Sequence, residues 1–145
     1  MGQIIEKVLI KNLFDIEKSE NGEIEEKDVR KVSIEAIVDT GASYLCLPPK
    51  VIQQLGLKYY NSSKVRTGNG PVELRFFKGA DIYIRDRFTQ LPVMENKNDD
   101  VPALIGVLVL EAMDYVVNPQ TGQVEGNPQH NGQWMADMFC LNRND

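Results

Sequence analysis

Apolar and polar residues alternate over short stretches along most of this 145-residue chain. Residues 4–16 carry β-favouring side chains broken by charges, which predicts one or two strands with a polar face. Residues 29–38 form a second such stretch, in which Ile34, Ala36 and Val38 alternate with polar neighbours. The Asn-Gly pair before an acidic stretch predicts a turn between these two regions.

The middle and the end of the chain continue this pattern of short strands and turns. Residues 65–74 predict a hairpin whose tip is rich in Gly and Asn. Val124 is expected to close a second hairpin after the turn at residues 118–122. Further strands are predicted at residues 73–77, 80–85, 88–95 and 115–117.

Two segments instead favour short helices. Pro49 begins a helical stretch that Gly56 ends, because proline suits the first turn of a helix. Residues 107–113 have helical spacing, with Leu108, Leu110 or Ala112 facing inward. Many short strands with two short helices predict an all-β fold, a small closed β-barrel or a sandwich.

Composition and charge exclude several classes of function. The net charge is −5 and the basic residues are scattered, so no nucleic-acid partner is expected. Cys46 and Cys140 lie far apart without a CxxC motif, so neither a disulfide framework nor a zinc site is expected. No apolar run approaches the roughly 20 residues that span a bilayer. We expect a cytoplasmic protein with no membrane contact, no metal and no cofactor.

Asp39 stands out because it follows the apolar strand directly and precedes Thr40 and Gly41. Burying an unpaired carboxylate costs free energy, so its position where an apolar strand ends in a Gly turn suggests a chemical role. A bare Asp-Thr-Gly is also compatible with an ordinary turn that has Gly in the left-handed region. The Gly-rich hairpin and the Ala-Leu-Ile-Gly of residues 103–106 follow it in order.

This order of motifs resembles the retropepsin-like aspartic proteases, and most closely their single-domain bacterial members. The resemblance covers roughly residues 29–117, with a weaker likeness in the tail, and it implies one acid-protease-type domain over residues 1–145. It also implies a two-fold homodimer, because the chain has a single Asp-Thr-Gly and peptide hydrolysis by this route needs two carboxylates. The tail, residues 118–145, would then contribute to the dimer interface.

The resemblance also implies roles for individual residues. Asp39, Thr40 and Gly41 would form the catalytic turn, with Thr40 bonding across the dimer. Substrate-binding residues would come from the same loop and from the hairpin tip, which would act as a flap over an extended peptide: Ala42, Ser43, Thr67, Gly68, Asn69 and Gly70. Ser43 is equally compatible with a turn serine. Gly106 would permit close packing behind the catalytic loop.

Other interpretations stay open at this point. The chain could be a retropepsin-like dimer that serves as a binding or assembly module with little peptidase activity, or a monomeric β-barrel with an incidental Asp-Thr-Gly. Cys46 is interpreted as a buried structural thiol, and the single histidine, His130, as a loop residue. The apolar residues 134–141 need a covering surface, for which a dimer contact is preferred to the core.

Overall fold

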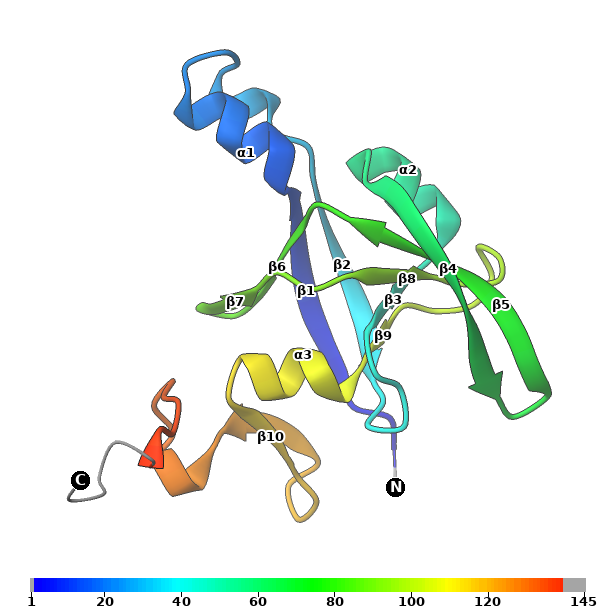
Figure 1. Ribbon diagram of the computed structural model, residues 1–145. Helices are drawn as coiled ribbons and strands as arrows, with labels where there is room; N and C mark the ends of the chain where they lie inside the picture. The colour runs from blue at the N-terminus through cyan, green and yellow to red at the C-terminus, as the bar shows by residue number, and fades with distance from the viewer. Residues whose placement is uncertain (1, 140–145) are drawn as a thin grey trace.

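The computed structural model describes residues 2–139 (Figure 1). Cys140 and Leu141, which belong to the predicted apolar tail, lie outside the described residues. The strands are β1 (Ile5–Asn12), β2 (Lys31–Val38), β3 (Leu45–Leu47), β4 (Lys58–Thr67), β5 (Gly70–Lys78), β6 (Ala80–Ile84), β7 (Arg87–Thr89), β8 (Val93–Glu95), β9 (Leu104–Ile105), β10 (Tyr115–Asn118) and β11 (Gln123–Gly126). The helices are α1 (Leu13–Glu20), α2 (Pro49–Leu55) and α3 (Val107–Ala112), with short 3₁₀ turns at Glu26–Asp28 and Pro128–His130.

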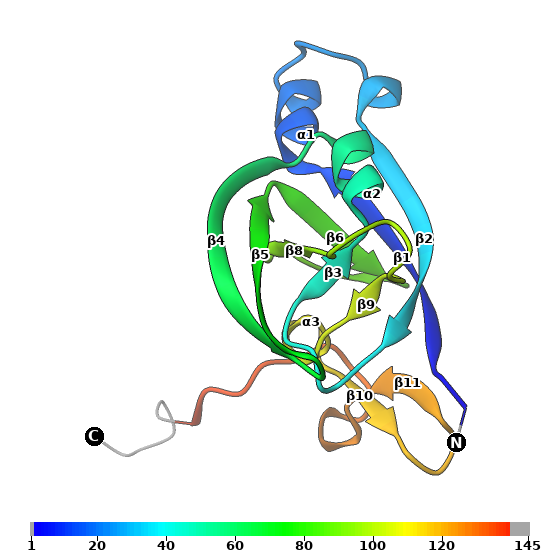
Figure 2. The same cartoon turned by 90° about the vertical axis from the view of Figure 1, so that its right-hand side faces the viewer.

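Nine of these strands form one sheet in the order β4-β5-β8-β3-β9-β2-β1-β6-β7, and β10 pairs with β11 separately. Figure 2 shows the sheet curling into a half-barrel, with β4 and β5 arching around one side. The predicted all-β class with few short helices is therefore confirmed. The two edges of the sheet are β4 and β7.

Branched apolar side chains from the central strands fill the core, where Ile10 of β1 pairs with Ile82 of β6. The predicted helix at Pro49–Leu55 is confirmed, and Gly56 ends it in the left-handed conformation with φ 66°. Its buried residues, Val51, Ile52 and Leu55, follow helical spacing, so one face of α2 closes the core.

Two of the predicted elements are wrong. Residues 13–16 belong to helix α1 rather than to a strand, because the buried Asn12 side chain caps the helix by accepting a hydrogen bond from the Asp15 N–H. Residues 88–95 do not form one strand: β7 pairs with β6, whereas β8 pairs with β5 and β3. Pro92 lies between them, and a proline cannot donate to a strand ladder.

The predicted inward face of α3 needs correction as well. Leu110 is buried as expected, but Leu108 is 37% exposed and Ala112 is also exposed. The buried face consists of Val109, Leu110 and Met113. The helix begins directly after Gly106, which follows the end of β9.

Candidate active site

Asp39 lies where three strand ends meet. Strand β9 runs between β2 and β3, parallel to β2 at Val38 and Ile105 and antiparallel to β3 at Leu45 and Ile105. The Asp39 N–H donates to the Ile105 carbonyl at 3.0 Å, which extends the ladder by one residue. The loop from Asp39 to Tyr44 therefore crosses the end of β9 and is fixed at its start by the sheet.

Hydrogen bonds within the loop orient the Asp39 carboxylate. The Gly41 N–H donates to Asp39 Oδ1 at 2.9 Å, and the Ala42 N–H donates to the Asp39 carbonyl at 3.0 Å. A Cβ on Gly41 would lie 3.2 Å from Asp39 Oδ1, which is a tight contact. The glycine thus lets the main chain approach the carboxylate closely.

Helix α3 holds the same loop from behind. The N–H groups of Val107 and Leu108 donate to the carbonyls of Ala42 and Ser43 at 2.8 and 3.0 Å. A Cβ on Gly106 would lie 2.3 Å from the Ser43 carbonyl carbon and 2.5 Å from the Tyr44 nitrogen. Only a residue without a side chain fits there, as the sequence analysis expected.

A groove of about 1080 Å³ opens between this loop and the β4–β5 hairpin. The hairpin matches the predicted one but is longer, and its tip is closed by a hydrogen bond from Thr67 Oγ1 to the Gly70 carbonyl at 2.6 Å. The predicted site residues that line the groove are Asp39, Gly41, Ala42, Ser43, Thr67, Gly68 and Asn69. Thr40 and Gly70 are not part of its lining.

Alternation along β5 gives the groove an apolar roof. Val72, Leu74 and Phe76 line the groove, whereas Glu73 and Arg75 between them are exposed and lie outside its lining. Phe76 packs edge-to-face against Tyr44, with ring centroids 5.1 Å apart. This aromatic contact joins the root of the hairpin to the Asp39 loop.

Several groove residues were not predicted from the sequence, including Tyr44, Met94, Asn96 and Leu104. Tyr44 directly follows the Asp-Thr-Gly-Ala-Ser run, which was a usable signal. Met94 and Asn96 gave no local signal, because their place beside the groove depends on the parallel pairing of β8 with β3.

The Cys46 side chain is only 4% exposed, as expected for a structural thiol. Burial, with a smaller contribution from the Asp39 charge, raises the pKa of the Cys46 thiol to about 12. A thiol with that pKa stays protonated at neutral pH and is a poor nucleophile. The proximity of Cys46 to the Asp-Thr-Gly turn therefore reflects packing.

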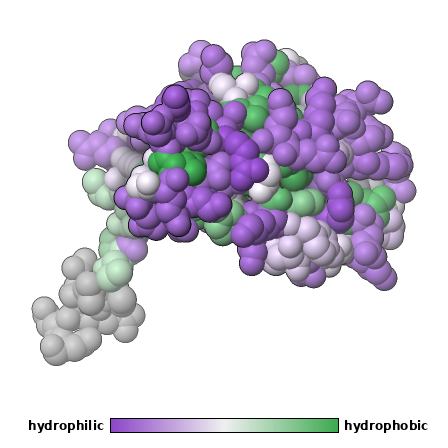
Figure 3. Space-filling view, turned by 90° about the horizontal axis from the view of Figure 1, so that it is seen from above, coloured by the Kyte–Doolittle hydropathy of each residue, from purple (hydrophilic) through white to green (hydrophobic). Residues whose placement is uncertain are grey.

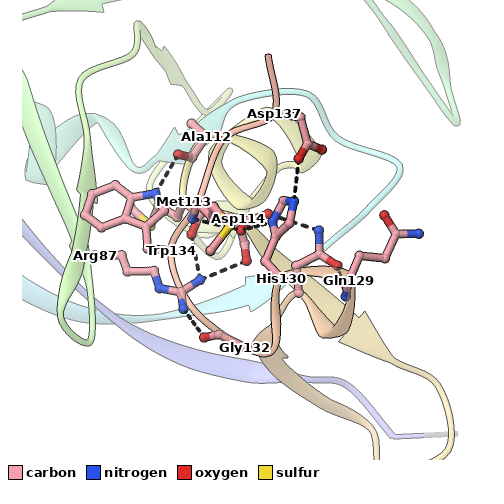
Figure 4. A network of polar contacts seen from close by, with 11 residues as sticks. Arg87, Ala112, Met113, Asp114, Gln129, His130, Gly132, Trp134 and Asp137 are labelled. Atoms are coloured by element: carbon pink, nitrogen blue, oxygen red, sulfur yellow. Dashed lines mark hydrogen bonds and ion pairs between the residues drawn. The ribbon is translucent and has the colours of Figure 1, made fainter. Parts of the chain in front are cut away.

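His130 is more constrained than its loop composition suggested (Figure 4). Its Nδ1 lies 2.6 Å from Asp114 Oδ2, and its Nε2 lies 3.0 Å from Asp137 Oδ1. Hydrogen bonds to Asp114 and Asp137 raise the pKa of His130 and outweigh the opposite effect of desolvation. Arg87 binds the same region by donating to the carbonyls of Met113, Asp114 and Gly132.

Asp114 is the centre of this cluster. Desolvation acts to raise its pKa, but hydrogen bonds from His130, Asn127 and the Met135 N–H outweigh that effect, and the net shift of the pKa is downward. The contacts connect the turn after α3 with the C-terminal segment, residues 127–137. The cluster fastens that segment to the domain.

We expect this attachment to depend on pH. The contribution of His130 to the stability of this attachment is complete below the ordinary histidine pKa of 6.5. It is lost as pH rises through the raised pKa of His130. The contribution of Asp114 is complete above the ordinary aspartate pKa of 3.8 and is lost as pH falls through its lowered pKa. Protection should therefore be greatest between those two values, measured as hydrogen exchange of the Met135 amide, which donates to Asp114 Oδ2.

His130→Gln is the test of that assignment, because it keeps a polar side chain but cannot titrate. In this variant, the Met135 amide should show low protection at every pH. The dependence of its protection on pH above neutrality should therefore disappear. If His130→Gln keeps the same pH dependence as the natural chain, the assignment to His130 is wrong.

Among residues 2–139 no group of three or more His, Cys, Asp or Glu side chains is arranged to hold a metal ion. Within the same range, no helix is long and apolar enough to cross a membrane.

The fold and the site together define a class: a mostly β domain in which an Asp-Thr-Gly turn, supported by a glycine and a short helix, faces a groove beneath a hairpin. Residues 26–112 match the model of the family described as "gag-polyprotein putative aspartyl protease". The chain belongs to this aspartyl protease family, and the matched range contains every predicted site residue. No match was found among curated proteins.

Proposed function

We propose that the protein is a homodimeric aspartic endopeptidase whose active site contains Asp39 from each of two subunits. One observation carries this proposal: within the described residues, Asp39 is the only carboxylate that lines the groove. A groove of about 1080 Å³ has room for several residues of an extended peptide. The site of one chain therefore has a substrate channel and half of the required acid pair.

The proposed chemistry uses the two carboxylates in different protonation states. Two carboxylates held close together cannot both ionise readily, so the pair shares one proton and titrates with two separated apparent pKa values. The ionised Asp39 takes a proton from a water molecule, which attacks the scissile carbonyl carbon. The protonated Asp39 donates a hydrogen bond to the carbonyl oxygen, which takes up the electron pair of the C=O π bond in the tetrahedral intermediate. When the intermediate collapses, the C–N bond breaks and the leaving nitrogen takes the proton that the other Asp39 removed from the water.

The surroundings of Asp39 support a second copy beside it. Thr40 is exposed, and its side chain has no hydrogen bond within residues 2–139, so it is free to bond across a two-fold axis as proposed. Gly41 supplies the N–H that orients the carboxylate. Together, Asp39, Thr40 and Gly41 form the proposed catalytic turn.

Peptide recognition is proposed to involve the loop and the hairpin tip. Ala42 and Ser43 of the loop would contact an extended substrate. The tip residues from Thr67 to Gly70 would pair with its main chain, as strands do in a sheet. Val72 and Leu74 would cover apolar substrate side chains. Closure of the hairpin would exclude water from the dyad.

The tail, residues 118–145, is a proposed part of the dimer interface, in a single domain over residues 1–145. Several apolar side chains of the tail are exposed: Trp134 is 44% exposed, Met135 45%, Met138 65% and Phe139 72%. The face seen in Figure 3 is largely hydrophilic with small separate apolar patches. Met138 and Phe139 have the most exposed large apolar side chains among residues 2–139. We propose the reducing cytoplasm as the compartment of the protein. The buried free thiol of Cys46 agrees with that proposal.

Cleavage that depends on dimerisation tests the proposal. At protein concentrations below the dimer dissociation constant, the initial rate should rise with the square of the concentration, and sedimentation should show the matching monomer–dimer equilibrium. A first-order dependence in a solution that sedimentation shows to be monomeric would contradict it. A confirmed dimer that cleaves no denatured protein or peptide library between about pH 3 and 7 would favour a binding or assembly module instead.

A further inference from the structure

Asn96 is a buried polar residue that the proposed mechanism does not use. It follows β8, and its N–H donates to the Leu47 carbonyl of β3 at 2.8 Å. The residue is only 7% exposed, yet it belongs to the groove lining. A buried carboxamide beside a peptide groove needs partners for its two N–H donors and for its oxygen.

The two donors are both satisfied, and their partners fix the orientation of the group. Asn96 Nδ2 donates to the carbonyls of Val101 and Pro102, each at 3.1 Å. Because carbonyls accept and never donate, the NH₂ end must face the loop before β9. The Oδ1 end must then face the other way.

The oxygen has no partner. No donor within residues 2–139 bonds to Asn96 Oδ1. Every fully buried side-chain nitrogen or oxygen in that range has a hydrogen-bond partner, so Asn96 Oδ1 cannot be fully buried. The oxygen must therefore reach solvent. Since Asn96 lines the groove, the opening available to this oxygen is the groove itself.

The sheet order sets the distance between Asn96 and the catalytic turn. Asp39 follows β2 and Asn96 follows β8, with β9 and β3 between them, so three strand spacings separate the two residues. Adjacent strands lie about 4.8 Å apart, so this separation is roughly 14 Å, about four residues of an extended peptide. A peptide that crosses the strand ends from Asp39 would bring a residue about four positions from the scissile bond next to Asn96.

We propose that Asn96 Oδ1 is a fixed acceptor for an N–H group of the bound peptide, about four residues from the scissile bond. The inference rests on the proposed peptidase function. An acceptor that is already oriented loses little entropy on binding, so it favours one register of the peptide. If the donor is the peptide main chain, proline is excluded at that position because it has no N–H.

A series of substrate peptides, each N-methylated at one position, tests this in the natural protein and in Asn96→Ala. In the natural protein, methylation about four residues from the scissile bond should lower kcat/KM roughly three- to tenfold, mainly through KM. In Asn96→Ala the same methylation should have no further effect. Equal losses in both proteins would overturn the inference.

A parallel series identifies the source of the N–H. Here the main chain is left intact and any amide or amine side chain at the same position is replaced by norleucine. Sensitivity to this replacement, without sensitivity to N-methylation, assigns the donor to the substrate side chain. Sensitivity to neither series in the natural protein overturns the inference.

Asn96→Ala leaves the carbonyls of Val101 and Pro102 without their donor, so this variant can lose its fold. A second measurement does not need the Asn96→Ala variant. The ¹³C chemical shift of the Asn96 carboxamide is followed in the Asp39→Asn protein while a substrate peptide is added. The shift should move with the parent peptide and not with the peptide lacking the donor. Because this readout is binding, it also separates a failed inference from a failed peptidase function; binding with an unmoved Asn96 signal refutes the inference alone.

Discussion

Replacing Asp39 by Asn should lower kcat/KM for peptide cleavage by roughly 10³-fold or more, because general acid and base steps each depend on this side chain. The asparagine has nearly the same shape, and its oxygen can still accept the hydrogen bond from the Gly41 N–H. The loop, the groove and the fold should therefore persist. Circular dichroism and thermal unfolding should match those of the natural protein while cleavage of a fluorogenic peptide is lost.

Asp100→Asn is the matched control for this change. Asp100 is exposed, its side chain makes no hydrogen bond within residues 2–139, and it lies outside the groove lining. The Asp100→Asn substitution removes one carboxylate charge, as Asp39→Asn does, but away from the groove. Cleavage should therefore stay within about twofold of the natural rate. Cleavage that survives Asp39→Asn would remove Asp39 from the catalytic role.

Gly106→Ala should be the most damaging single methyl group added to the domain. The new Cβ would lie 2.3 Å from the Ser43 carbonyl carbon and 2.5 Å from its oxygen, both main-chain atoms that cannot rotate away. We expect the free energy of unfolding to fall by about 3 kcal/mol, the upper range for overpacking. The loop that carries Asp39 would also shift, so cleavage should fall even in the folded fraction.

Gly68→Ala serves as the control, because a Cβ at Gly68 would meet no heavy atom within 4 Å. Urea unfolding of both variants measures the difference directly. A Gly106→Ala protein as stable as Gly68→Ala would show that the contact between α3 and the Asp39 loop is looser than described.

The parts of this fold that sequence analysis predicted have local causes. Pro49 and Gly56 begin and end α2 through their own backbone preferences, so that helix was predicted with its correct bounds. The hairpin tip from Thr67 to Gly70 was also predictable, because its Gly and Asn residues favour turns. The family model then confirmed the relationship that the Asp-Thr-Gly turn and its companions indicated.

The errors have non-local causes. Helix α1 depends on Asn12, whose buried amide also donates to the Leu55 carbonyl, 43 residues away. Asn96 and Met94 reach the groove only because β8 inserts beside β3. His130 looked like a loop residue because its partners, Asp114 and Asp137, come from segments that meet only in the folded chain. Sequence spacing contains no information about such meetings.

A mixing experiment tests the central claim most directly. Natural protein is held at a fixed amount, and inactive Asp39→Asn protein is added under conditions where subunits exchange. If each active site needs Asp39 from both subunits, mixed dimers are inactive, and activity should fall in proportion to the fraction of natural subunits that still pair with each other. Activity that stays constant, however much Asp39→Asn protein is added and exchanged, would contradict the account by showing that one subunit contains a complete active site.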